Sequence, residues 1–254
     1  MKTKQFIGLT FAAAVTFMSS NVFAQENEET TTQPAQITFA YPLGSNGAEA
    51  IFTPNNFSFN VLYGLNGGLY GTEIGGIMNY NQGDVNGFQL AGLVNVNTEK
   101  TNGVMWAGKS NISLGETSGV MIAGLYNLST GNSKGVQIST VNNAIADFTG
   151  FQMGVVNYAQ RLDGVQLGVV NVVGDGENAV PIGLINVVRN GHYELEIVSG
   201  EVLFTNLNYK MGVEHFYTIF KVGFSSYKGN PVYSTGIGFG TIVTLAEKHK
   251  VSID

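Results

Sequence analysis

The residues that could carry chemistry are concentrated in the last quarter of the chain. Glu194 and Glu196 are separated by one residue, a spacing that would place both carboxylates on one side of a β-strand as a general acid and base. Glu201 follows closely. The same spacing fits an ordinary polar side of a strand, which is the interpretation we prefer. We therefore predict no catalytic residue and no enzymatic activity.

The other candidate motifs are weaker still. The histidines His192, His215 and His249 fall in separate segments without metal-ligand spacing, and we interpret them as isolated surface residues. Residues 174–179 read GDGENA and match G-x-G-x-x-A, but a dinucleotide fingerprint needs a following helix, and a strand is expected here. The chain has no cysteine, which removes thiolate ligands and nucleophiles. We expect no cofactor and no metal.

The elements that must position these side chains are dominated by a repeat. Eight asparagines recur at steps of 16, 16, 16, 15, 15, 14 and 15 residues, namely Asn79, Asn95, Asn111, Asn127, Asn142, Asn157, Asn171 and Asn186. In seven copies a glycine stands three residues earlier, namely Gly76, Gly92, Gly108, Gly124, Gly154, Gly168 and Gly183. We interpret both sets as structural repeat positions.

Each copy consists of an apolar stretch followed by polar, turn-forming residues. No copy has the 3.6-residue period of a helix, so each predicts one strand and one connection. The early copies have one residue more than the later ones between their opening glycine and the asparagine, as in 87–95 against 150–157. Because an extra residue inverts the side-chain alternation of a strand, we expect a β-bulge there.

Two all-β architectures fit this repeat. One is a repeat-built antiparallel sheet that resembles an outer-membrane β-barrel; the other is a β-solenoid of 14–16-residue coils with a ladder of stacked asparagines. The near-uniform period favours the solenoid. The carboxyl-terminal third favours the barrel, because Tyr233, Ile237 and Phe239 alternate there with Gly236 and Gly238. We expect the barrel-like sheet and keep the solenoid as the alternative.

The chain divides into three segments. Lys2 and Lys4, an apolar stretch at 6–18 and a small-residue cleavage site ending at Ala24 predict a signal peptide at 1–24. Residues 25–36 are polar and acidic, which predicts a disordered linker. Residues 37–254 form one β domain, with repeats at about 71–190 and longer alternating strands at 191–254. We also expect the sequence to be truncated, because it stops inside an expected strand.

Composition limits the partners. Loss of Lys2 and Lys4 with the signal peptide leaves 10 basic and 18 acidic residues, a net charge of −8, which argues against nucleic acid. No apolar run after the signal peptide is long enough for a transmembrane helix, so a membrane-spanning form would have to be a closed β-barrel. Trp106 fits a membrane interface or buried packing equally well.

The repeat unit G-h-Q-h-G-h-h-N, where h is hydrophobic, resembles the surface-repeat proteins of Bacteroidetes and spirochaetes. Gln89, Gln137, Gln152 and Gln166 match its glutamine, whereas Met105 and Met121 depart from it. Residues 183–224 also resemble the region that follows the repeats in Bacteroidetes members. The resemblance implies an outer-membrane or cell-surface setting and supplies no catalytic residue.

We therefore expect an exported, non-enzymatic structural or interaction protein of the outer membrane or cell surface. Outer-membrane lipid is the expected partner, and a protein or glycan partner is left open. The alternative is a secreted, soluble β-solenoid that binds glycan or protein, in the periplasm or outside the cell.

Overall fold

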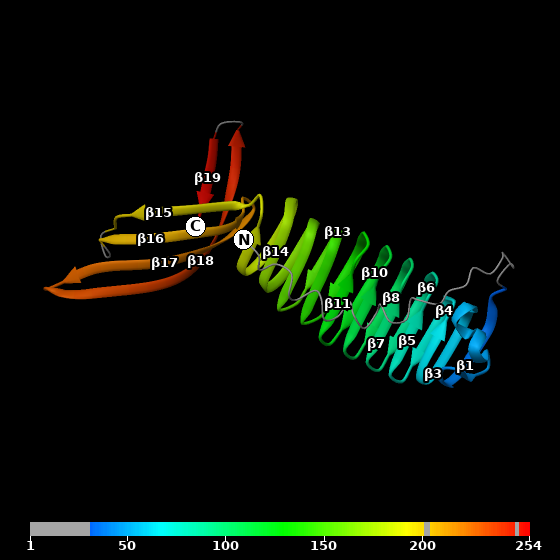
Figure 1. Cartoon of the computed structure of the whole chain (residues 1–254). Helices are drawn as coiled ribbons and strands as arrows, with labels where there is room; N and C mark the ends of the chain where they lie inside the picture. Colours follow the sequence, from blue (N-terminus) through cyan, green and yellow to red (C-terminus); the bar gives the residue numbers. More distant parts are fainter. Residues whose placement is uncertain (1–30, 201–203, 247–248) are drawn as a thin grey trace, which may run out of the picture. The chain divides into compact units, whose positions relative to one another are not determined.

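The chain is all-β, as predicted, in a computed structural model that describes residues 31–200, 204–246 and 249–254 (Figure 1). The predicted signal peptide and residues 25–30 of the predicted linker lie outside the described residues. Strand β1 (Gln33–Ala40) begins four residues before the predicted start of the ordered domain. The reason is Gln36, whose side chain is fully buried and accepts a hydrogen bond from Asn46 at 2.8 Å.

The repeats form a β-solenoid in which each copy is one coil, and Figure 1 shows the coils stacked on one another. One sheet contains β4 (Gly68–Gly75), β6 (Val85–Ala91), β8 (Thr101–Ala107), β10 (Thr117–Ala123) and β12 (Ser133–Ile138). The second contains β5 (Met78–Asn81), β7 (Val94–Asn97), β9 (Ser110–Ser113) and β11 (Tyr126–Ser129). Strands β13 (Val141–Met153) and β14 (Val156–Val188) continue the stack.

The expected antiparallel pairing of the repeats is therefore wrong, and the solenoid alternative is confirmed. Neighbouring coils pair in parallel and in register, so that Asn95 lies beside Asn111 and Gly87 beside Gly103. Only this arrangement places each asparagine against its own equivalent, where its amide can bond the next one. An antiparallel meander would have separated them.

The glycine that opens each coil is needed for this close stacking. Gly87 has a φ of +153°, and a Cβ on it would lie 1.8 Å from the carbonyl oxygen of Gly71 in the coil before. Gly103, Gly119, Gly135, Gly150 and Gly164 share this geometry. The spacing of coils is thus set by backbone contact at this column.

The predicted bulge is wrong. The early coils pair without a register shift along β4, β6, β8 and β10. Their extra residue lies at the corner between the two sheets, where Gly92 and Leu93 separate β6 from β7. Inward alternation has to be kept only within a continuous strand. Gln89 and Asn95, six residues apart, and Gln152 and Asn157, five residues apart, therefore all point inward on either side of their corners.

The asparagines form one continuous ladder inside the solenoid. Each Nδ2 donates to the Oδ1 of the next asparagine at 2.9–3.0 Å, from Asn79 to Asn186, and every one of these side chains is fully buried. Most also donate to a backbone carbonyl at the end of the strand before the next corner, as Asn95 does to Trp106 at 3.0 Å. The ladder therefore bonds coil to coil and fixes each corner.

Both ends of the ladder are capped. At the amino end, β1, β2 (Leu43–Gly44), the 3₁₀ helix η1 (Gly47–Phe52) and β3 (Pro54–Asn66) precede the coils. Asn60 of β3 donates to Asn79 at 3.0 Å. The side-chain amide of Asn60 occupies the space that the missing side chain of Gly64 leaves free. At the carboxyl end Asn186 donates to the hydroxyl of Thr218 at 3.1 Å, and that hydroxyl donates to the carbonyl of Gly183.

Thr218 belongs to an antiparallel sheet that follows the solenoid. Its order is β15 (His192–Val198), β16 (Thr205–Val213), β17 (Phe216–Tyr227), β18 (Asn230–Ala246) and β19 (His249–Ile253). Val213 packs in an apolar cluster with Phe148, Leu162, Val173 and Val188 of the last coils. The predicted alternation of β18 is confirmed: Tyr233, Ile237 and Phe239 are exposed on one face, while Gly238 and Gly240 face Ile219 and Tyr217.

We predict that Asn111→Ala lowers the free energy of unfolding by about 2–4 kcal/mol, because it leaves one buried amide N–H of Asn95 without its acceptor and the buried Oδ1 of Asn127 without its donor. Chemical denaturation followed by circular dichroism measures this loss. Asn102→Ala, at an exposed outward position, should change stability by less than about 0.5 kcal/mol. Equal losses in the two variants would contradict a special role for the ladder.

Candidate functional site

The repeat positions singled out by the sequence lie in the framework of the solenoid. All eight asparagines are fully buried, and the glycines that precede them stack at the corners, where a Cβ on Gly92 would lie 1.9 Å from the carbonyl oxygen of Gly76. Residues 174–179 lie within strand β14, and no helix follows them, in agreement with the rejection of a dinucleotide motif. The repeat asparagines therefore serve the framework, and Asp175 of the second feature lies 3.9 Å from Arg161 at the surface.

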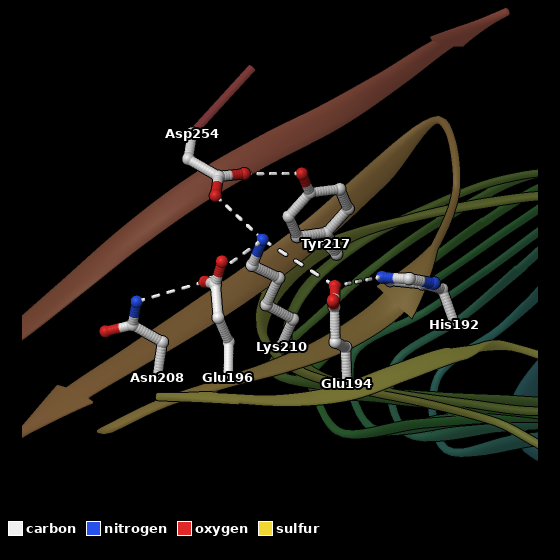
Figure 2. Close-up of polar contacts among 7 residues, drawn as sticks. All are labelled: His192, Glu194, Glu196, Asn208, Lys210, Tyr217 and Asp254. Atoms are coloured by element: carbon white, nitrogen blue, oxygen red, sulfur yellow. Dashed lines mark hydrogen bonds and ion pairs between the residues drawn. The ribbon is translucent and has the colours of Figure 1, made fainter. Parts of the chain in front are cut away.

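The acidic pair of the sequence does join a charged cluster, on one face of the antiparallel sheet (Figure 2). Lys210 of β16, only 3% exposed, lies 3.7 Å from Glu194, 3.5 Å from Glu196 and 2.8 Å from Asp254. His192 contacts Glu194 at 3.4 Å. Figure 2 shows the three carboxylates converging on the single ammonium group.

Among the histidines and glutamates that the sequence offered as candidates for chemistry, the structure brings His192, Glu194 and Glu196 together. His215 is exposed in the turn between β16 and β17. Glu201 and the side chain of His249 lie outside the described part of the structure. Sequence reasoning missed Lys210, Tyr217 and Asp254. The signal that could have found Lys210 is strand pairing, because it lies opposite Glu194 in the β15–β16 register.

The electrostatics of this cluster fix its charges. Burial alone would lower the pKa of Lys210, but its hydrogen bond and charge interaction with Asp254, together with Glu196 and Glu194, raise it above its ordinary value. Burial would raise the pKa of Asp254, whereas hydrogen bonds from Lys210 and Tyr217 lower it. Burial and the Asp254 carboxylate raise the pKa of Tyr217 to about 12.

At neutral pH, Lys210 and Tyr217 are therefore protonated and Asp254 is ionised. The charges of Lys210 and Asp254 compensate each other, and the neutral Tyr217 hydroxyl donates a hydrogen bond to Asp254. The shifted pKa values hold the protons on Lys210 and Tyr217, whereas general acid–base catalysis needs a group that gives up its proton near neutral pH. Among the described residues, no group of three acidic or histidine side chains could hold a metal ion. The arrangement suits an ion network that fastens β16 and β17 to the segment that ends at Asp254.

A buried ionisable group also lies inside the solenoid. Glu73 is fully buried in β4 at the register of the repeat glutamine, beside Gln89. The side-chain amides of Asn60, Asn66, Asn81 and Gln89 all donate to its carboxylate, at 3.0 Å for Asn60 and 2.9 Å for Gln89. The sequence signal for this residue was available, since Glu73 follows Gly71 as Gln89 follows Gly87.

One edge of the solenoid's outer surface is apolar, in contrast to its amide-lined interior. We call the residues two positions before each ladder asparagine the corner ridge: Ile77, Leu93, Lys109, Leu125, Thr140, Val155, Val169 and Leu184. All are exposed, with Leu125 at 53%. Trp106, 51% exposed, lies just before the ridge, so buried packing of this residue is excluded.

Charged residues gather at the opposite end of each coil. We call this the turn edge, formed by the polar connections and the residues beside them: Asp84, Glu99, Lys100, Glu116, Lys134, Asp147, Arg161, Asp163, Asp175 and Arg189. A coil consists of two strands joined by the corner at one end and by the polar turn at the other, so the two edges lie at opposite ends of its cross-section. The exposed apolar surface, rather than the charged cluster, is the best candidate for a functional site.

We predict that the buried Glu73 makes stability depend on pH. Burial raises its pKa from 4.5 to about 7, against the four amide hydrogen bonds that lower it. The folded state therefore binds this proton more tightly than the unfolded state. Its stabilising contribution is fully present below pH 4.5 and is lost as the pH rises through 7.

The test compares Glu73→Gln with the parent chain in denaturation experiments between pH 5 and pH 8. Over this range the parent should lose about 2–3 kcal/mol relative to the variant, because glutamine does not titrate. Glu99→Gln, the same change at an exposed turn, should follow the parent profile. Parallel profiles for Glu73→Gln and the parent would contradict the prediction.

We predict that Lys210→Met destabilises the antiparallel sheet by about 2 kcal/mol, because it leaves three carboxylates without their shared cation. The value is modest because Glu194 and Glu196 are partly solvated. Lys221→Met removes an exposed lysine of the same sheet that acts on Asp254 through its charge and forms no ion pair with the cluster among the described residues, and it should cost less than about 0.5 kcal/mol. Thermal unfolding followed by circular dichroism measures both, and an unaltered melting temperature in Lys210→Met would rule out a stabilising network.

Comparison with known proteins assigns no family to the chain. No protein-family model matches it, and no curated protein or solved structure matches it either. The geometry of the described residues is therefore the basis for a functional assignment.

Proposed function

We propose that this chain is an exported, non-enzymatic structural or interaction protein of the outer membrane or cell surface. The observation that carries the proposal is the inverted polarity of the solenoid. Amides line its interior, as at Asn95 and Gln89, while Leu93, Trp106 and Leu125 are about half exposed outside. Its resemblance to surface-repeat proteins of Bacteroidetes and spirochaetes points in the same direction.

The antiparallel sheet adds to this support. Tyr233 and Ile197 are each 73% exposed, and Phe224 and Phe239 are also exposed on the face away from Lys210. Soluble monomers rarely expose contiguous apolar patches of this kind without a partner to cover them. Within the described residues, no helix is long and apolar enough to cross a membrane. The proposal assigns contact with the partner to the exposed strand faces described above.

The second candidate is a secreted, soluble solenoid that binds glycan or protein. The observation that favours it is a shallow polar groove along the turn edge, lined by Lys100, Asn102, Glu116, Ser118, Asn132 and Lys134. Amide, hydroxyl and charged groups of this kind can bond to the hydroxyls of a sugar. Binding at the polar groove gives no role to the exposed apolar edge, so we place this candidate second.

The test is fractionation of cells that express the full chain. We expect the protein in the outer-membrane fraction, resistant to a high-salt wash and released by detergent, because apolar contact is not screened by salt. A soluble periplasmic marker protein is the control for incomplete separation. Recovery of the intact chain with that marker would reject the proposal in favour of the soluble binding module.

A further inference from the structure

We propose that the corner ridge seats the solenoid in the hydrocarbon of a lipid surface, with the turn edge directed to water. The inference rests on the proposed function and specifies the partner of the same apolar surface as lipid acyl chains. Its basis is the composition of the ridge, the state of the backbone beneath it and the distribution of charge around each coil.

The ridge is a mostly apolar line that is interrupted at two positions. Six of its eight residues are aliphatic, and Lys109 and Thr140 are the exceptions. Exposed apolar side chains continue on the adjoining strand, where Trp106, Met153 and Leu167 stand one or two residues before the corner glycine. The ridge and its flank could thus enter hydrocarbon together without burying a charge other than Lys109, whose long side chain can extend toward the surface.

The backbone at the corners is already satisfied within the protein. The N–H groups of Leu93, Lys109 and Leu125 each donate to the carbonyl of the ridge residue one coil earlier, at 2.9–3.0 Å. The carbonyls that end the preceding strands accept from the ladder, as at Leu90 and Ile122. The turn edge has equivalent coil-to-coil bonds, such as the one from the N–H of Thr98 to the carbonyl of Asn81 at 3.0 Å. This bonding therefore does not single out the ridge, but it allows the ridge to enter hydrocarbon, which offers no other partner to a backbone group.

The charge distribution completes an amphipathic cross-section. Described charges of the coils lie on the turn edge, apart from the enclosed Glu73 and the ridge residue Lys109. Such segregation is typical of elements that lie in a membrane interface. With a net charge of −6, the chain has no general attraction to anionic lipid, so the seat must be hydrophobic rather than electrostatic.

Lipid fits this edge better than a protein partner does. A specific protein interface pairs hydrogen-bonding groups across its area, about one bond for every 100–200 Å². The six aliphatic ridge positions offer no side-chain donor or acceptor, and the backbone beneath them is engaged. Fluid acyl chains require neither register nor polar matching.

Trp106, the single tryptophan of the chain, is a natural reporter beside the ridge. We expect its fluorescence in the full-length protein to shift to shorter wavelength when phosphatidylcholine vesicles are added. The shift should persist in high salt and should be no larger with vesicles that contain anionic phosphatidylglycerol. Loss of the fluorescence shift in high salt would overturn hydrophobic binding of the ridge to lipid.

The ridge is tested with a double variant, Leu93→Glu with Leu125→Glu, which should bind phosphatidylcholine vesicles at least about tenfold more weakly, since it removes two apolar anchors. The matched control, Asn102→Glu with Asn132→Glu, adds the same charge at exposed positions by the turn edge and should bind within about twofold of the parent. Circular dichroism checks that both variants remain folded. Equal weakening in both would overturn the assignment to the ridge.

The remaining outcomes separate this inference from the proposed function. A chain that fractionates with outer membranes but shows no shift with vesicles keeps the proposed function and overturns the lipid seat. A shift that depends on protein concentration and needs no lipid would overturn it in favour of a second copy. A chain found in the soluble periplasm that still binds vesicles through the ridge would overturn the proposed setting alone.

Discussion

The fold depends on the bonding of the buried asparagine amide. Each ladder asparagine has to match its neighbour on both sides, because the donor of one coil needs the acceptor of the next at 2.9–3.0 Å. A buried amide without a partner costs far more than a satisfied one contributes, so the ladder tolerates no gap. This requirement explains the recurrence of one residue type across eight coils, and also why Asn60 and Thr218 must continue the bonding at the two ends.

This bonding permits an interior that holds little apolar volume. In the middle coils the two sheets enclose small or polar side chains such as Ala107, Thr101 and Ser113, with Met105 and Met121 replacing the repeat glutamine. Other large apolar side chains are enclosed near the two ends of the stack, with Leu69 in β4 and with Phe148 and Leu162 packing with Val213 of the following sheet. Amides thus hold the coils together over most of the stack, and the bulk of the apolar side chains is left outside.

The sequence predicted the strands well and their arrangement less well. The period of Asn79 to Asn186 defined the coils, and the alternation of Tyr233 to Phe239 defined the faces of β18, because both are local patterns. The choice of architecture was wrong because the antiparallel pattern of the last quarter was extended to repeats that pair differently. The predicted bulge failed for a similar reason, since a corner between sheets releases side chains from strand alternation.

For the candidate sites too, local spacing predicted part of the arrangement, and the rest depends on strand pairing. Spacing placed Glu194 and Glu196 on one face, but their partners Lys210 and Asp254 come from other strands, and only pairing brings them together. Glu73 could have been read from its register with Gln89, whereas its four amide donors depend on the packing of the amino-terminal coils. The exposure of the ridge depends on which side of each coil faces inward, which period alone does not determine.

The in-register stacking has a consequence for the evolution of chain length. Because Asn95 meets Asn111 in the same way that Asn111 meets Asn127, a segment of sixteen residues can be duplicated or lost between them and the new junction reproduces the old one. The amino-terminal strands and the carboxyl-terminal sheet then close a shorter or longer stack unchanged. Such a fold can vary its reach by whole coils through unequal recombination, while the chemistry at either terminus is inherited intact.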